Sequence, residues 1–111
     1  MLNTAECAVR YIEGLQANNF FHVPFDADVT FDGAVLEQLV GRAVVVETLT
    51  QVAHQMTDIR VKQQIVQGEH ACVLFQFVAA GEVIEVCDYF RVSNGSIVEV
   101  RAFFDPRPIV S

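Results

Sequence analysis

The sequence is poor in basic residues. It contains 7 lysines and arginines against 14 aspartates and glutamates, which gives a formal net charge of −7 over 111 residues. A surface of this sign repels a phosphate backbone, because nucleic-acid binding depends on basic side chains that displace counterions. The charge balance therefore argues against nucleic acid as a partner.

Long apolar runs are also absent. No stretch approaches the roughly 20 apolar residues that a membrane helix needs, and the first residues are polar rather than a basic segment followed by an apolar one. We therefore expect a soluble protein without a membrane partner, located in the cytoplasm.

Motifs that hold metals, phosphates or disulfides are missing as well. The cysteines are odd in number and lack Cys-x-x-Cys spacing, and the histidines are scattered; these residues are Cys7, Cys72, Cys87, His22, His54 and His70. No glycine-rich phosphate loop occurs. We therefore expect buried free thiols, no metal site and no cofactor.

Hydrophobic residues, in contrast, make up 52% of the chain, which is ample for one core in a domain of this size. Apolar residues recur at helical spacing over residues 4–17 and 43–56, and Asn3 with Glu6 resembles a capping box before the first of these helices. Residues 20–25 are aromatic but include a proline, which favours a short helical turn.

The segment between the predicted helices alternates in polarity up to Gly33, which indicates a β-hairpin with residues 34–39. The second half of the chain predicts a meander of strands over residues 59–67, 71–79, 83–92 and 96–104. Helices at the start and strands at the end favour one α+β domain over residues 1–111, with helices on one face of an antiparallel sheet.

Asp88 is the one charged residue on an otherwise apolar strand face. Side chains alternate between the two faces of a strand, so Asp88 lies on the same face as Ile84, Val86, Phe90 and Val92. A turn at Ala80-Gly81 pairs Asp88 with Val73 on the preceding strand. A two-residue turn at Asn94-Gly95 would pair Asp88 with Arg101 on the following strand. A three-residue loop over residues 93–95 pairs it with Val100 instead and keeps Arg101 on the other face, so we expect the second register.

A buried carboxylate without a partner is costly, so Asp88 should be protonated or hydrogen-bonded. One interpretation is structural, with Asp88 tying the sheet to a helix or turn. The other places Asp88 in a pocket, whose further lining would be His22, Phe75, Phe77, Val86, Val100, Ala102 and Phe104.

Three stretches of the sequence resemble the nuclear transport factor 2-like superfamily, in particular its SnoaL-like and ketosteroid isomerase-like branch. They are AVRYIEGLQANN, FDADVTF and VCDYFRVSNGSIVEVRAFFDP. The resemblance covers nearly the whole chain. It implies a cone-shaped, curved antiparallel sheet with N-terminal helices packed on its concave face, a cystatin-like α+β barrel that encloses an apolar pocket.

In ketosteroid isomerases a tyrosine and a protonated aspartic acid form an oxyanion hole, while a second aspartate shuttles the proton. The resemblance places Tyr11 and Asp88 at the first two positions. The third position falls on Gly33, with Asp32 one residue earlier and facing outward unless a bulge re-aims it. His22 is a further candidate for the base.

Three functions therefore stay open. The protein could isomerise a carbonyl compound through an enolate held by Tyr11 and protonated Asp88, with Asp32 or His22 moving the proton. It could instead bind a small apolar molecule without catalysis, which the missing base favours. The third is assembly as a homodimer through an apolar outer sheet face made of Cys72, Leu74, Val78, Val83, Cys87, Tyr89, Ile97 and Phe103.

Overall fold

The computed structural model describes residues 1–34 and 37–107, and it contains two helices and one sheet of six strands. The elements are α1 (Thr4–Ala17), β1 (Phe25–Asp32), β2 (Leu39–Val40), α2 (Arg42–Ala53), β3 (Thr57–Gln67), β4 (His70–Ala79), β5 (Glu82–Ser93) and β6 (Ser96–Phe104). The order of strands in the sheet is β2-β1-β6-β5-β4-β3.

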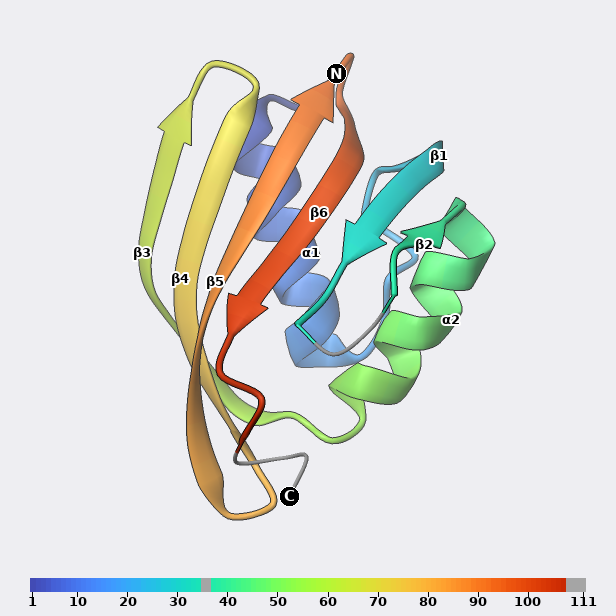
Figure 1. Ribbon diagram of the computed structural model, residues 1–111. Helices are drawn as coiled ribbons and strands as arrows, with labels where there is room; N and C mark the ends of the chain where they lie inside the picture. The colour runs from blue at the N-terminus through green and yellow to red at the C-terminus, as the bar shows by residue number, and fades with distance from the viewer. Residues whose placement is uncertain (35–36, 108–111) are drawn as a thin grey trace.

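The sheet curves around α1, and α2 lies next to β1 and β2 (Figure 1). The α+β class and the curved sheet with helices on its concave side are confirmed. The sheet is mixed rather than wholly antiparallel, because β1 runs parallel to β6. It also stays open, since β2 and β3 form its two edges.

The first helix forms where the sequence predicted it. Asn3 accepts a hydrogen bond from the backbone N–H of Glu6, and the Glu6 carboxylate accepts one from the backbone N–H of Asn3. This reciprocal pair satisfies two of the N–H groups that every helix start leaves free. At the other end, Asn18 adopts a left-handed conformation that closes the helix.

The second helix ends at Ala53, three residues before the predicted end. His54 and Gln55 form a turn there, and β3 begins at Thr57. Residues 20–25 give only a turn, closed by a hydrogen bond from the N–H of Val23 to the carbonyl of Phe20, and Phe25 already belongs to β1. Residues 35 and 36 of the predicted hairpin lie outside the described residues, although β2 pairs antiparallel to β1 as expected.

The central strands place Asp88 on the inner face, as alternation predicted. Asp88 pairs with Val73 on β4, and the turn at Ala80-Gly81 is confirmed. On the other side, the predicted pairing with Val100 is wrong, because Asp88 pairs with Ala102.

The reason for this difference is a two-residue turn followed by a bulge. Asn94 and Gly95 both have positive φ, at 52° and 76°, which suits the tight turn that Asn-Gly favours. A register shift between Arg91 and Val92 then leaves one extra residue on β6. The bulge restores the parity that the short turn alone would have lost, so Val100 stays inward.

The bulge also changes which residue near the turn is buried. Ile97, expected on the outer face, is fully buried, whereas Val98 is only partly buried. The predicted outer-face patch is therefore wrong at Ile97. Its other members are half-buried or exposed on the convex face, with Val83 59% and Phe103 50% exposed.

The core lies between α1 and the concave face of β4, β5 and β6. Tyr11 on α1 packs edge-to-face against Phe90 on β5, with 4.8 Å between the ring centroids, and against Phe25 on β1 at 6.1 Å. The contacts between these large buried rings hold the middle of α1 against the sheet.

Candidate functional site

A cavity of about 400 Å³ lies between the concave sheet face and the two helices. This volume falls within the range of roughly 300–1,000 Å³ that is typical of small-molecule sites. Its lining is mostly apolar and comes from nearly every element; it consists of Tyr11, Leu15, Phe31, Gly33, Ala34, Thr48, Leu49, Gln51, Val52, Gln55, Met56, Phe75, Phe77, Ala79, Val86, Asp88, Ala102 and Phe104.

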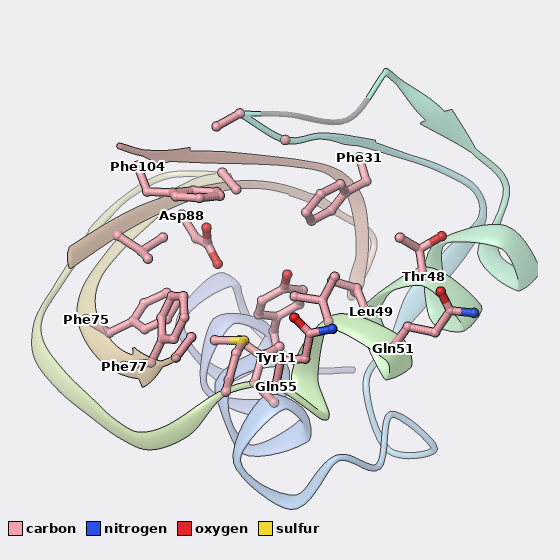
Figure 2. Close-up of a pocket in the computed structure, with 18 residues that line it drawn as sticks. Tyr11, Phe31, Thr48, Leu49, Gln51, Gln55, Phe75, Phe77, Asp88 and Phe104 are labelled. Atoms are coloured by element: carbon pink, nitrogen blue, oxygen red, sulfur yellow. The ribbon is translucent and has the colours of Figure 1, made fainter. Parts of the chain in front are cut away.

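Among the described residues of this lining, Tyr11 and Asp88 are the only ionisable ones. Figure 2 shows the Asp88 carboxyl group pointing into the cavity from the sheet and the Tyr11 hydroxyl group pointing into it from α1. Both residues are almost completely buried, with 3% and 1% of their surface exposed. The two side chains that the sequence singled out therefore face one shared space.

Burial controls the charge of Asp88. It raises the pKa of this carboxyl group from 3.8 to about 8, so the neutral acid predominates at pH 7. One carboxyl oxygen, Oδ1, is fully buried and has no hydrogen-bond partner within residues 1–34 and 37–107. A protonated carboxyl group offers one O–H donor, so Asp88 has unused hydrogen-bonding capacity toward the cavity.

Tyr11 is held in its neutral form by the same environment. Burial raises its pKa well above the usual value, and the nearby Asp88 charge raises it further. In the described part of the chain no hydrogen bond connects the Tyr11 hydroxyl group to Asp88. Two neutral O–H donors are therefore available to a ligand oxygen that enters the cavity.

Most of the predicted lining residues are in place. Phe75, Phe77, Val86, Ala102 and Phe104 all line the cavity. Val100 lies on the same face but is completely buried in the core, so it does not reach the cavity.

The two candidates for a base lie outside the cavity. Asp32 is half-buried at the end of β1 and accepts a hydrogen bond of 3.2 Å from Gln38, and it lines a separate hollow beside Arg101. Gly33, the next residue, faces the cavity instead. His22 is exposed and packs its ring against Phe21. This placement does not support either residue as the base.

Sequence reasoning missed the contribution of α2. Thr48, Gln51 and Val52 on this helix line the cavity, and so do Gln55 and Met56 in the region that follows. Their spacing of three and four residues puts them on one side of a helix, beside the buried Leu49. This periodicity was visible in the sequence, but the sequence does not say that this side borders a cavity rather than solvent.

The described residues contain no group of three or more histidine, cysteine, aspartate and glutamate side chains that could hold a metal ion. No helix in the described ranges is long and apolar enough to cross a membrane.

Comparison with known proteins gives a family and a fold. A family model described as "Domain of unknown function (DUF4904)" matches residues 3–111. No curated protein matches the chain.

Several solved structures share the fold. A nuclear transport factor 2-like protein of unknown function from Cytophaga hutchinsonii is 20% identical, with a TM-score of 0.80 and coverage of 100% of this chain and 97% of that one. A steroid delta-isomerase from Pseudomonas aeruginosa is 18% identical, with a TM-score of 0.83 and coverage of 97% and 83%. A protein assigned to the SnoaL-like polyketide cyclases from Jannaschia sp. CCS1 is 13% identical, with a TM-score of 0.79 and coverage of 96% and 88%.

Proposed function

The chain belongs to the DUF4904 family and has the fold of nuclear transport factor 2-like proteins, and we propose that it binds a small, uncharged apolar molecule through one oxygen atom. The oxygen accepts hydrogen bonds from the neutral Asp88 carboxyl group and the Tyr11 hydroxyl group. The observation that carries this proposal is the Asp88 carboxyl group, which points into a mostly apolar cavity and has an oxygen without a hydrogen-bond partner among the described residues.

The chemistry of the lining selects the ligand class. The lining contains no lysine, arginine or histidine, so a carboxylate or phosphate would lose its hydration without gaining a partner. The oxygen of a ketone or an alcohol can accept hydrogen bonds from the two donors. The carbon skeleton of the same molecule can pack against the aromatic side chains of the lining. Asp88 must be protonated to donate, so binding weakens as pH rises through about 8.

The test uses 2-acetylnaphthalene, a neutral aromatic ketone, in a calorimetric titration at pH 6.5 and pH 9.5. We expect Asp88→Asn to retain binding at both values, because an amide N–H also donates. Wild type should bind about 30-fold more weakly at pH 9.5 than at pH 6.5, because little protonated Asp88 remains at the higher pH. Asp88→Leu and Tyr11→Phe should each weaken binding about fivefold or more at pH 6.5, since each removes one donor.

Asp32→Asn is the matched control, because Asp32 lies outside the cavity and the substitution should leave the affinity unchanged. If Asp88→Leu bound the ketone as tightly as wild type at pH 6.5, the assigned role of Asp88 would be wrong.

A second candidate function is isomerisation of a carbonyl compound, which is supported by two observations. The chain has the fold of a steroid delta-isomerase, and one carboxyl group and one hydroxyl group face the same cavity. With Asp32 outside the cavity, Asp88 is the only carboxyl group on the lining. In its ionised form Asp88 could take the proton from the carbon next to the carbonyl group and return it two carbons farther along, while Tyr11 donates to the enolate oxygen.

Turnover of an unconjugated ketone separates the two functions. If catalysis occurs, kcat should rise with pH as Asp88 ionises, and Asp88→Asn should abolish turnover while retaining ligand binding. Absence of turnover with every unconjugated ketone tested, together with pH-dependent binding of 2-acetylnaphthalene, would leave binding as the function.

We also propose that the convex sheet face pairs two copies of the chain. Phe103, with 50% of its surface exposed, pairs with the half-buried Cys87, and Leu74 lies beside Cys87 on β4. Val83, 59% exposed, lies farther along the same face, beyond Gln76 and Glu85. A contiguous apolar patch on a sheet is a frequent site of self-association.

Sedimentation at micromolar concentration tests this pairing. We expect twice the chain mass of 12.3 kDa, and we expect Phe103→Glu to give the monomer because a buried unpaired charge is costly. Phe21→Glu is the matched control, since Phe21 is 83% exposed away from this sheet face. A monomeric wild type would rule the pairing out.

A further inference from the structure

The side of the cavity formed by α2 and the turn after it differs from the rest of the lining. Apart from Tyr11 and Asp88, all side chains of the lining that carry hydrogen-bonding groups come from this one segment; they are Thr48, Gln51 and Gln55. Thr48 and Gln51 lie on α2, and Gln55 lies in the turn after it. The spacing of three and four residues, with His54 still in a right-handed helical conformation, keeps them on one side.

These three side chains lie at the solvent end of the cavity. Gln51 and Gln55 are exposed and Thr48 is half-buried, whereas Tyr11 and Asp88 are almost fully buried. In the described ranges none of the three makes a side-chain hydrogen bond to another residue, although the neighbouring Thr50 bonds back to the carbonyl of Val46. Figure 2 shows Gln55 extending from this segment toward the cavity, on the opposite side from Asp88.

The two ends of the cavity therefore offer different chemistry. The inner end offers two O–H donors, while an amide side chain both donates and accepts hydrogen bonds. The other labelled side chains of the lining in Figure 2, among them Phe31, Leu49 and Phe75, are apolar. Neither end carries a positive charge, which disfavours an anionic group at the mouth as well as inside.

We propose that Gln55 is the specificity-determining residue of a second polar subsite, which selects neutral, elongated ligands that carry a hydroxyl, carbonyl or amide group at each end. This inference rests on the proposed binding function and adds the outer half of the ligand to it. Gln51 and Thr48 extend the same subsite along α2. A ligand with a polar group at the inner end alone binds without contact to Gln55.

The test compares ligands that differ only at the far end. 2-Acetylnaphthalene is paired with 6-hydroxy-2-acetylnaphthalene, and 4-acetylbiphenyl with 4-acetyl-4′-hydroxybiphenyl, so that two lengths are covered. Dissociation constants are measured calorimetrically at pH 6.5. In wild type we expect the hydroxylated member of at least one pair to bind about fivefold more tightly, as one net hydrogen bond allows.

Gln55→Leu keeps the side-chain size and removes both hydrogen-bonding groups. In this variant we expect the preference for the hydroxylated ligand to vanish, because both members of a pair then meet an apolar side chain at this position. Gln67→Leu, at the far end of β3 and outside the cavity lining, is the matched control and should keep the preference.

The outcomes separate this inference from the function on which it rests. If wild type binds a plain ketone but prefers neither hydroxylated ligand, or if Gln55→Leu keeps the preference, the subsite is overturned and the proposed function stands. If no ketone binds wild type at pH 6.5, the proposed function itself fails, and the subsite fails with it.

Discussion

Replacing Asp88 by asparagine should change how the stability of this protein depends on pH. The two side chains have the same shape, but asparagine does not titrate. In wild type, burial raises the pKa of Asp88 from 3.8 to about 8, so the folded protein keeps a proton that the unfolded chain releases above about pH 4. The folded state of the variant keeps no such proton.

The sign and size of the effect follow from this difference in bound protons. Between about pH 4 and pH 8 the free energy of unfolding of wild type falls as pH rises, by up to roughly 1.4 kcal/mol per pH unit from this group alone. Over the whole window the loss reaches at most roughly 6 kcal/mol, which is a large part of the 5–15 kcal/mol of a typical domain. Below and above the window Asp88 contributes no slope.

Urea denaturation followed by circular dichroism at half-unit intervals from pH 5 to pH 9 measures this slope. Carboxylates with lowered pKa values, such as Asp105, make the free energy of unfolding rise with pH, and their contribution is the same in the variant and in wild type. The difference between variant and wild type therefore isolates Asp88, and it should shift in favour of the variant as pH rises to about 8. Parallel curves for the two proteins across this range would refute a neutral, buried Asp88.

Three further experiments test the packing and the local structure. Phe90→Ala removes a completely buried ring and should lower the free energy of unfolding by about 3–5 kcal/mol in urea denaturation; a loss below about 1 kcal/mol would contradict its place in the core. Asn3→Ala removes the capping side chain of α1 and should cost about 1 kcal/mol in the same assay, against no change if the cap is not formed. Gly95→Ala should destabilise more than Gly68→Ala, because both glycines have positive φ but only at position 95 would the new Cβ approach another side chain, at 2.6 Å from Met1; equal melting temperatures for the two variants would show that this contact is absent.

Local features of the sequence were sufficient to locate most elements. Alternation on the strand around Asp88 fixed which face it occupies, because residues two positions apart on a strand lie on the same face and the neighbours of Asp88 at this spacing are apolar. The capping pair at Asn3 and Glu6 fixed the start of α1, since both hydrogen bonds act within one turn. These predictions depend only on residues that are close to one another in the chain, so they can be made from the sequence.

The register of β6 depended on something less local. Both candidate turns at Asn94-Gly95 agreed with the local sequence, and the bulge near Val92 decided the pairing of Asp88 with Ala102. A bulge is favoured here because it keeps Arg101 out of the core while retaining the tight Asn-Gly turn. Turn geometry and burial together decide the register of β5 and β6, so the alternation of apolar and polar residues on one of these strands was not sufficient to predict it.

The same division holds for the site. The sequence by itself determined the inward strand face that carries Asp88, because alternation gives each strand residue a defined direction, and the resemblance to ketosteroid isomerases singled out the face of the first helix that carries Tyr11. Only the tertiary structure decided that these two faces meet at one cavity, that Asp32 lies outside it, and that Thr48, Gln51 and Gln55 border it. Periodicity fixes the direction of a side chain, but the curvature of the sheet and the position of α2 against it fix what lies in that direction.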